Sequence, residues 1–485
     1  MGTKLPNNEN PGGTARNRRT PPDNDFTKSI AMITRRAHEA KQTVASDAMR
    51  NAAKTAAVAS LLVVTLLWFA GLGAAPAGFA AAGRLAALWS TDLLLIQVVL
   101  IARIPWLERA YGHDTLSRWH RWTGFGSFHL MLAHVVLAVI GSARRAGTDP
   151  IGQLGTLVTS YPSIALALAA LLAFVLVVVS SVRVVFRKLR YESWHLLHLW
   201  AYPGVIMAVP HEFLLGSDFR GPVARTYWWG FYALAAGSTL LFRVGLPAWR
   251  TLRHRITVDE VVSEAPGLVS VYLRGRRLDR LPARAGQYFV WRFVDGQGVF
   301  QGNPFSLSGR PDADRLRITV KSVGDGSARV ATLRPGTRAL IEGPYGRMTA
   351  ATYAGGRVTM LACGIGVTPL LALLWDLPYG YGRATLVYRA RHAHDLAFRA
   401  ELARLEHERG LRVVALVGPR AAAGSWLPMA YADYADTEAL RTLSPDIAGH
   451  DVYVCGPDPW ADAVFRAARQ VGVPPARLHR ERFAW

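Results

Sequence analysis

Three histidines interrupt a stretch of the chain that is apolar enough to cross a membrane. Residues 118–140 contain His120, His129 and His134. An ionisable side chain inside a membrane helix is costly and marks a functional site by default. His120 and His134 lie about four helical turns and about 21 Å apart, within about 40° of one face, whereas His129 lies about 140° away from His134. Two neutral imidazoles along one inward face suit the axial ligation of two haem irons.

A second apolar stretch, WHLLHLWAYPGVIMAVPHEF, supplies partner ligands. It contains His198 and His211, which lie about 140° apart on an ideal helix. Pro203 and Pro210 lie between them, and proline is a usual cause of the kink that would bring both rings to one side. His195 is the alternative to His198. Two spaced pairs on separate helices favour haem ligation over simple hydrogen bonding between helices.

The 485-residue chain has a net charge of +22 and 51% hydrophobic residues, and these are unevenly distributed. Residues 1–50 lack a sustained apolar pattern and are predicted to form a disordered basic cytoplasmic arm, with 25–50 as a candidate helix at the membrane surface. No signal peptide is expected, because the first apolar stretch begins late and is too long for one. Length and unevenness together predict several domains.

Residues 51–250 contain six hydrophobic segments and are predicted to form a six-helix transmembrane bundle. The second segment is the weakest of the six, because it contains Asp92 and Arg103. The sixth is short and starts with the aromatic run YWWGFY, which is typical of a membrane interface. The six segments are residues 55–83, 86–105, 118–140, 163–182, 194–213 and 226–242.

Basic residues predict the orientation of this bundle. They cluster in the arm and at residues 103–121, 183–190 and 243–255, on alternate sides of six spans. Both termini are therefore expected in the cytoplasm of a multi-pass cell-membrane protein. The inner histidine pair is then His120 with His198, and the outer pair is His134 with His211. The excess charge reflects topology, and nucleic acid is not an expected partner because no recognised module accompanies it. No pattern predicts an oligomeric state.

Beyond residue 255 the composition becomes that of soluble domains. Short runs such as LVSVYLRG and RLRITVKSV, broken by Gly, Pro and Asp, predict a small antiparallel β-barrel over residues 251–352. Over residues 353–485, the strand RVTMLA, the glycine turn CGIGVTP and the helix LLALLWDL begin an alternating pattern. That pattern predicts a doubly wound α/β domain. Two cysteines, Cys363 and Cys455, fit a cytosolic domain without a disulfide framework.

The motifs of this region, taken together, carry a resemblance. GQYFVW, NPFSLS, KSVGDGS and GPYG, followed by ACGIGVTP, YVCGP and RERF, resemble the ferredoxin-reductase-type flavin and nicotinamide module. Behind six spans with paired histidines, the chain resembles the ferric reductase and NADPH oxidase superfamily over about residues 56–485. The resemblance implies FAD, NADPH or NADH, and two b haems as cofactors. Each motif alone is modest evidence, but their order and spacing are specific.

The resemblance implies a flavin site around NPFSLS. Ser306 would approach the reactive nitrogen of the flavin ring, which makes it a candidate catalytic residue. The family usually has a basic residue where Asn303 stands, and an asparagine cannot neutralise the flavin diphosphate. Gly326 and Ser327 would donate hydrogen bonds to the pyrophosphate. The other cofactor-binding residues that these motifs imply are Tyr288, Pro304, Phe305 and Lys321.

The nucleotide site is expected at CGIGVTP. Gly364 and Gly366 stand between a buried strand and a helix start, where a pyrophosphate can rest on backbone amides. Arg389 and Arg391 follow the next strand in place of an acidic ribose-binding residue, which favours the 2′-phosphate of NADPH. In the family the CGP segment lies beside the nicotinamide, so Cys455 is a candidate catalytic residue. The remaining implied contacts are Thr368, Gly456 and Pro457.

The C-terminal residues RERFAW carry the last candidate catalytic group. In the superfamily an aromatic residue near the chain end stacks on the flavin face where the nicotinamide must bind. Phe483 is assigned this role, with Trp485 as the alternative. A stacked ring adds about 0.5–1.5 kcal/mol beyond area burial, little enough for a nicotinamide to displace it. Simple packing of the last strand is the competing interpretation.

The implied function is a transmembrane NAD(P)H-dependent oxidoreductase that passes electrons through FAD and two haems to a one-electron acceptor at the outer face. Oxidases of the superfamily often have a further histidine one turn after the outer ligand, where this chain has Ala138. This favours ferric iron, as in a ferric-chelate reductase, over dioxygen. A quinone or partner-protein acceptor stays open. So does a membrane-anchored reductase serving a cytosolic acceptor, although an anchor does not need paired histidines.

Overall fold

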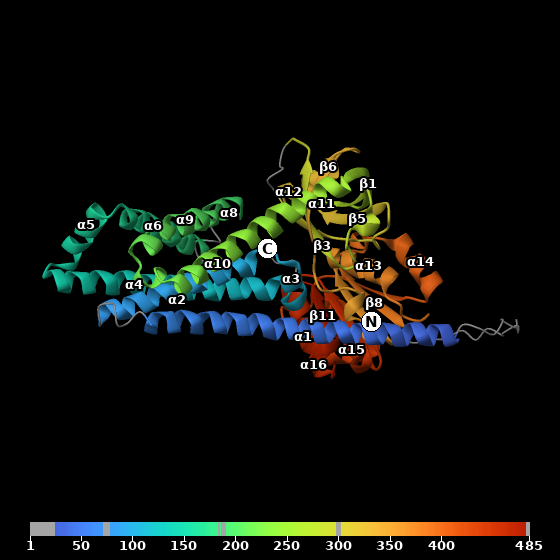
Figure 1. Cartoon of the computed structure of the whole chain (residues 1–485). Coiled ribbons are helices and arrows are strands. Elements are labelled where there is room, and N and C mark those ends of the chain that lie inside the picture. The colour runs from blue at the N-terminus through green and yellow to red at the C-terminus, as the bar shows by residue number, and fades with distance from the viewer. Residues whose placement is uncertain (1–24, 71–77, 183–184, 186–190, 297–301, 482–485) are drawn as a thin grey trace, which may run out of the picture. The chain divides into compact units, whose positions relative to one another are not determined.

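A computed structural model describes the chain except for residues 1–24, 71–77, 183–184, 186–190, 297–301 and 482–485 (Figure 1). The chain divides into two compact units: Ser46–Leu246 is helical, and Met1–Ala45 together with Pro247–Trp485 forms the unit that contains both sheets. Helix α1 (Asp25–Ala70) begins inside the arm that was predicted to be disordered, so residues 25–50 are helical. Residues 1–24 of the arm lie outside the described residues.

The helical unit has five segments, within the described residues, that are long and apolar enough to cross a membrane. They are Ala48–Ala70, Phe79–Ile101, His113–Ala146, Pro162–Ser181 and Pro222–His254. They belong to α1, α2 (Phe79–Ile101), α4 (His113–Ala146), α6 (Pro162–Ser181) and α10 (Pro222–Thr239), the last continuing through a π-helical turn into α11 (Leu246–His254). Two short helices, α3 (Pro105–Tyr111) and α5 (Pro150–Ser160), connect them. The first two spans are divided differently from the prediction, because α1 ends at Ala70 and α2 begins at Phe79.

The fifth predicted span, residues 194–213, is not one continuous helix. It is broken at Trp200 into α8 (Tyr191–Leu199) and α9 (Ala201–Leu215), each too short to cross a membrane alone. The cause is Pro203, which has no N–H to donate to the carbonyl of Leu199 one turn earlier. Within the described residues, the predicted six-helix bundle is therefore five long helices and one broken pair, and the break lies in the stretch where the prolines predicted a kink.

Helices α2 and α4 pack antiparallel in a single register. Ser90 and Ser127 exchange two hydrogen bonds, each donated by a hydroxyl to the other residue's carbonyl at 2.8 Å. Seven residues away in each direction, the backbone carbonyls of Gln97 and Gly83 contact histidines 120 and 134 of α4. Contacts repeating every seven residues are the pattern of helices that coil around each other.

The charges that weakened the second predicted span do not face lipid. Asp92 is fully buried, and its Oδ1 accepts hydrogen bonds from Ser60 at 2.5 Å and Tyr227 at 2.7 Å, which joins α1, α2 and α10. Arg103 lies beyond the end of α2 and pairs with Glu108 of α3 at 3.3 Å. Polar groups inside a membrane are tolerated when helices hydrogen-bond to one another in this way.

Two further polar contacts fasten the bundle. Glu212 of α9 accepts hydrogen bonds from Thr91 of α2 at 3.0 Å and from Tyr232 of α10 at 2.5 Å. Arg84 of α2 makes a bidentate pair with Asp218, which lies in the loop after α9, at 2.7 and 2.6 Å. These contacts hold α9, the second half of the broken helix, against α2 and α10.

The first sheet of the C-terminal unit is antiparallel, with strand order β4-β3-β6-β1-β2-β5. Its edges meet where a bridge joins Leu307, just after β4, to Ile318 of β5. Alternating side chains such as Phe289, Trp291 and Ile318 fill a fully buried core. The strands are β1 (Thr257–Ala265), β2 (Leu268–Arg274), β3 (Tyr288–Val294), β4 (Asn303–Ser306), β5 (Arg315–Lys321) and β6 (Arg338–Tyr345).

The second sheet is parallel, with order β11-β10-β7-β8-β9, and helices cover both faces. Helices α13 (Val367–Asp376) and α14 (Arg399–Arg409) pack on one face, and α15 (Asp436–Leu443) and α16 (Asp458–Gln470) on the other. The chain order reverses between β7 and β10, where ligands bind in such folds. The strands are β7 (Val358–Cys363), β8 (Ala384–Ala390), β9 (Arg412–Val417), β10 (Asp451–Cys455) and β11 (Leu478–Glu481).

Candidate functional site

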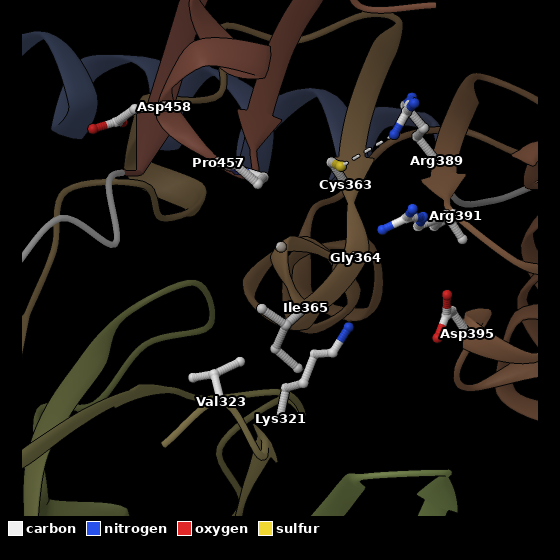
Figure 2. A pocket seen from close by; sticks show the side chains of 13 residues that line it. Lys321, Val323, Cys363, Gly364, Ile365, Arg389, Arg391, Asp395, Pro457 and Asp458 are labelled. Atoms are coloured by element: carbon white, nitrogen blue, oxygen red, sulfur yellow. Dashed lines mark hydrogen bonds between the residues drawn. The ribbon is translucent and has the colours of Figure 1, made fainter. Parts of the chain in front are cut away.

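A cavity of about 520 Å³ opens at the carboxyl ends of β7, β8 and β10. Figure 2 shows Lys321 and Val323 approaching it from the antiparallel sheet, opposite the glycine turn after β7. The structure therefore brings groups from both sheets to the crevice where the strand order reverses. Seven residues that the sequence predicted for cofactor binding line it: Lys321, Gly364, Gly366, Arg389, Arg391, Gly456 and Pro457.

Close backbone approach explains the glycines of this crevice. Gly364 has a φ of +56°, in the left-handed region that favours glycine. A Cβ on Gly366 would lie 2.1 Å from the carbonyl oxygen of Cys455 at the end of β10. A Cβ on Gly456 would lie 2.8 Å from the Cβ of Cys363. The turn after β7 and the end of β10 therefore approach this closely because Gly366 and Gly456 lack a Cβ.

The two predicted arginines differ in their surroundings. Arg389 is buried, donates to the carbonyl of Gly418 at 3.3 Å and lies 4.0 Å from the Cys363 sulfur. Arg391 is exposed, and in Figure 2 its guanidinium and the Lys321 ammonium point towards the same space, near Asp395. Two cations from different sheets make this side of the cavity suited to a phosphate. Arg391 is accordingly the stronger candidate for a 2′-phosphate.

Cys455 does not line the cavity. It is fully buried, and its sulfur lies 4.0 Å from the carbonyl oxygen of Glu481, whereas Cys363 forms part of the cavity wall. Burial raises the pKa of the Cys363 thiol and raises the pKa of Cys455 well above its usual range. Both thiols are therefore neutral near pH 7. Thr368 is also buried away from the cavity, and its hydroxyl donates to the carbonyl of Ile365 at 2.9 Å.

The predicted flavin residues gather on the β3–β4 pair. Tyr288 stands directly opposite Ser306 in the antiparallel register, and Phe305 and Pro304 continue β4. The hydroxyl of Ser306 is buried and has no hydrogen-bond partner within the described part of the chain. A buried hydroxyl without a partner costs about 1–3 kcal/mol. This strand therefore fits a bound group that offers Ser306 a hydrogen bond, as a flavin ring nitrogen would.

Other predicted flavin contacts are less direct. Asn303 begins β4 opposite Trp291. Ser327 lies in an exposed turn with Gly326, where its hydroxyl accepts from the backbone amides of Val323 and Gly324 at 2.9 and 3.0 Å. That hydroxyl shapes the turn itself. Phe483 and Trp485, the candidates for the stacked aromatic, lie outside the described residues.

In the helical unit the four predicted histidines form two ring pairs. The centroids of the His120 and His198 rings lie 6.0 Å apart, and those of His134 and His211 lie 6.2 Å apart. Two imidazoles bonded to one metal at about 2 Å each put their centroids roughly 6 Å apart. His195 is exposed, and His198 faces His120 in its place. Both pairs therefore have the spacing of axial ligands.

Hydrogen bonds orient three of these rings. The Nδ1 atoms of His120 and His134 donate to the carbonyls of Gln97 and Gly83, at 3.0 and 2.9 Å. His198 Nδ1 lies 3.3 Å from the Ser181 hydroxyl, whereas His211 Nδ1 is buried without a partner among the described residues. A donor at Nδ1 leaves the Nε2 lone pair free for a metal, as in most histidine ligands. These residues fit two haem groups.

Several cavity residues were missed by the sequence analysis, notably Cys363, Asp395 and Asp458. Cys363 precedes the glycine turn, but a strand buried on both faces gives no alternation that tells which side chains reach its end. Asp395 lies in an irregular loop with no spacing to interpret. Asp458 directly follows the CGP segment, so its position in the sequence could have predicted it.

Comparison with known families gives two matches in separate parts of the chain. Residues 86–209 match the family model for the ferric reductase like transmembrane component. Residues 360–465 match the oxidoreductase NAD-binding domain. The first range contains His120, His134 and His198 and ends two residues before His211, and the second contains the glycine turn and most of the cavity wall.

Relatives resemble about half of this chain. It is 29% identical over 233 residues to the ferredoxin reductase component of 3-ketosteroid-9-alpha-monooxygenase from Mycolicibacterium smegmatis, covering 47% of this chain and 63% of that protein. It is 31% identical over 256 residues to a flavohemoprotein from Chromobacterium violaceum, covering 49% and 61%. The chain thus spans less than two thirds of each of these two relatives. Among solved structures, the Amycolatopsis cytochrome P450 reductase GcoB matches with a TM-score of 0.38 and 24% sequence identity. The match covers 47% of this chain and 69% of that one.

The contact between Gly366 and Cys455 predicts the effect of a methyl group. We expect Gly366→Ala to push the turn away from β10, because overpacking of this kind costs about 1–3 kcal/mol. The apparent Kd for NADP⁺, measured by titration of the purified protein, should rise by about tenfold or more. Gly449→Ala is the matched control, since nothing lies within 4 Å of the position its Cβ would take. Equal nucleotide affinity in the two variants would contradict the prediction.

Proposed function

We propose that this membrane protein, which has the domain architecture of the ferric reductase and NADPH oxidase superfamily, passes electrons from NADPH through FAD and two b haems to an acceptor at the outer face. Its ferric-reductase-like membrane domain is fused to a ferredoxin-reductase-type FAD and NAD module, so electron transfer by an oxidoreductase is the premise. The haems, the direction across the membrane and the acceptor are the proposal. Both termini are then cytoplasmic.

The two histidine ring pairs are the observation that carries this proposal. Their centroid distances of 6.0 and 6.2 Å suit axial ligation, and each pair joins α4 to one half of the broken helix. His120 and His198 would hold one haem, and His134 and His211 the other. Haem iron accepts single electrons, and a flavin supplies the exchange between a two-electron hydride and single electrons. A bundle that only anchored the reductase would need neither pair.

At the nucleotide end the chain's own residues would bind and orient the donor. The amides of the turn at Gly364 and Gly366 would hold the pyrophosphate, and Arg391 with Lys321 would bind the 2′-phosphate. Ser306, buried and without a partner, would hydrogen-bond to the flavin ring. Asn303 contributes no charge at the flavin diphosphate, so we expect FAD to be lost more readily than from relatives with a basic residue there.

Ferric iron in a chelate is the acceptor we favour. The position one turn beyond His134 is Ala138, whose side chain offers no hydrogen bond to a bound dioxygen. An NADPH oxidase that forms superoxide is the second candidate, favoured by the same architecture. Ferrous iron trapped by a colorimetric chelator, measured with and without superoxide dismutase, separates the two. Iron reduction that superoxide dismutase abolishes would favour the oxidase.

The haem proposal predicts separate losses for the two pairs. His120→Ala and His198→Ala should each remove one haem, and His134→Ala and His211→Ala the other, because one axial ligand is lost in each case. Reduced-minus-oxidised spectra and the haem-to-protein ratio of purified protein measure this. His129→Ala is the control, since His129 is exposed and turned away from both pairs. Wild-type protein without haem would refute the proposal.

The cofactor proposal predicts a preference that depends on one arginine. NADPH should have a higher kcat/KM than NADH, and Arg391→Ala should reduce that ratio by about one to two orders of magnitude, the value of a charge-assisted contact of about 1.5–3 kcal/mol. Asp395→Asn is the control, because it changes a different charge in the same cavity, and it should not lower the NADPH-to-NADH ratio. Equal use of both nucleotides by the wild type would argue against a 2′-phosphate site.

A further inference from the structure

An ion pair joins the antiparallel sheet to the α/β domain. Arg317 in β5 donates from both terminal nitrogens to Glu401 in α14, at 2.7 Å to Oε2 and 3.0 Å to Oε1. The side chains are only 12% and 22% exposed. A bidentate arginine–carboxylate pair that is largely removed from water demands narrow geometry. It therefore constrains where α14 can lie relative to β5.

On the flavin side, the same guanidinium contacts the segment that directly follows β4. Strand β4 carries Ser306 and is called the flavin strand below. Arg317 Nη2 donates to the carbonyl of Ser308 at 2.5 Å, and its Nε donates to the Ser308 hydroxyl at 3.2 Å. Ser308 is fully buried, and Thr319 of β5 also donates to its hydroxyl, at 2.7 Å. Ser308 stands two positions after Ser306 in the chain. A shift of Arg317 would thus move the end of the flavin strand.

On the nucleotide side, Glu401 contacts the helix that follows the glycine turn, and Arg317 contacts the end of the loop after β8. Glu401 Oε1 accepts a hydrogen bond at 2.6 Å from Trp375 of α13, the helix that begins at the glycine turn. The guanidinium carbon of Arg317 lies 5.3 Å from the ring centre of Phe398. Phe398 ends the loop after β8 that contains Asp395 and its cavity-lining neighbours. Flavin strand, cavity loop and helix α13 therefore meet at one ion pair.

We propose that Arg317 and Glu401 are positioning residues for hydride transfer, and that their ion pair fixes the nucleotide-binding loops at the correct distance from the flavin strand. This rests on the proposed function, which supplies the nicotinamide and the flavin. In that step the C–H bond of the nicotinamide would break and its hydride, with both electrons of that bond, would bond to the flavin nitrogen, so the nicotinamide would be oxidised and the flavin reduced. A misplacement of about 1 Å can slow such a step about a hundredfold.

The location of the pair separates this role from binding. Neither Arg317 nor Glu401 lines the cavity. Loss of the pair should therefore change the rate at saturating nucleotide and leave the nucleotide affinity nearly unchanged. A residue that only stabilised the fold would instead lower FAD content and the thermal midpoint without a specific effect on hydride transfer.

The test uses the full-length protein with bound FAD, mixed rapidly and without oxygen with NADPH or with NADPH deuterated at the transferred position. Glu401→Gln and Arg317→Lys should each slow flavin reduction at saturating NADPH by about tenfold or more and raise the deuterium isotope effect. The apparent Kd for NADPH should stay within about twofold. The double variant should be no slower than the slower single variant, because the two residues act as a unit.

Glu408→Gln is the matched control. It breaks the Arg404–Glu408 pair, at 2.6 Å, on the exposed side of the same helix, and it should leave the rate unchanged. FAD content is measured for each variant. If Glu401→Gln loses FAD, the rate measured with Arg317→Lys, which keeps the positive charge, tests the inference. Wild-type rates in both Glu401→Gln and Arg317→Lys, or equal slowing by Glu408→Gln, would overturn the inference. A wild-type flavin that NADPH does not reduce would refute the proposed function itself.

Discussion

The antiparallel register of α2 on α4 determines where both histidine pairs form. Ser90 and Ser127 set it at the centre, and the carbonyls of Gln97 and Gly83 then meet His120 and His134, seven residues away on either side. An ideal straight helix drifts about 20° per heptad, so two heptads account for the 40° offset between these histidines. Because α2 and α4 contact each other every seven residues, both rings can hydrogen-bond to carbonyls of the same helix, α2.

The sequence predicted that the four histidines would pair, because the fixed period of a helix relates the spacing of two residues to the directions in which they point. The structure brings the four rings together in two pairs. The sequence could not resolve the spacing of His198 and His211, since that depends on where the helix breaks. The break falls at Trp200, before Pro203, and each half then turns its own histidine towards α4. Local chemistry indicated a kink, but the packing of the neighbouring helices decides its direction.

The nucleotide crevice was predictable where backbone chemistry dominates and less so where tertiary contacts do. Gly364 and Gly366 stand where the glycine pattern requires, because a Cβ would collide or strain the turn. Cys455 and Thr368 were predicted to be in the site, but both are buried away from the cavity. Their orientation could not be predicted, because a strand or helix that is buried on all sides has no polar and apolar faces to distinguish. The contact of Arg317 with Glu401 spans two domains, and no local pattern relates residues so far apart in sequence.

The break at Trp200 has an evolutionary consequence. In one rigid helix, a substitution that rotated His198 would rotate His211 as well, so the two positions would have to evolve together. Two short helices joined at a hinge separate them: α8 can adjust against α6 through Ser181 while α9 keeps its contacts with α2 and α10 through Glu212. Selection can therefore adjust the geometry of one histidine pair without disturbing the other.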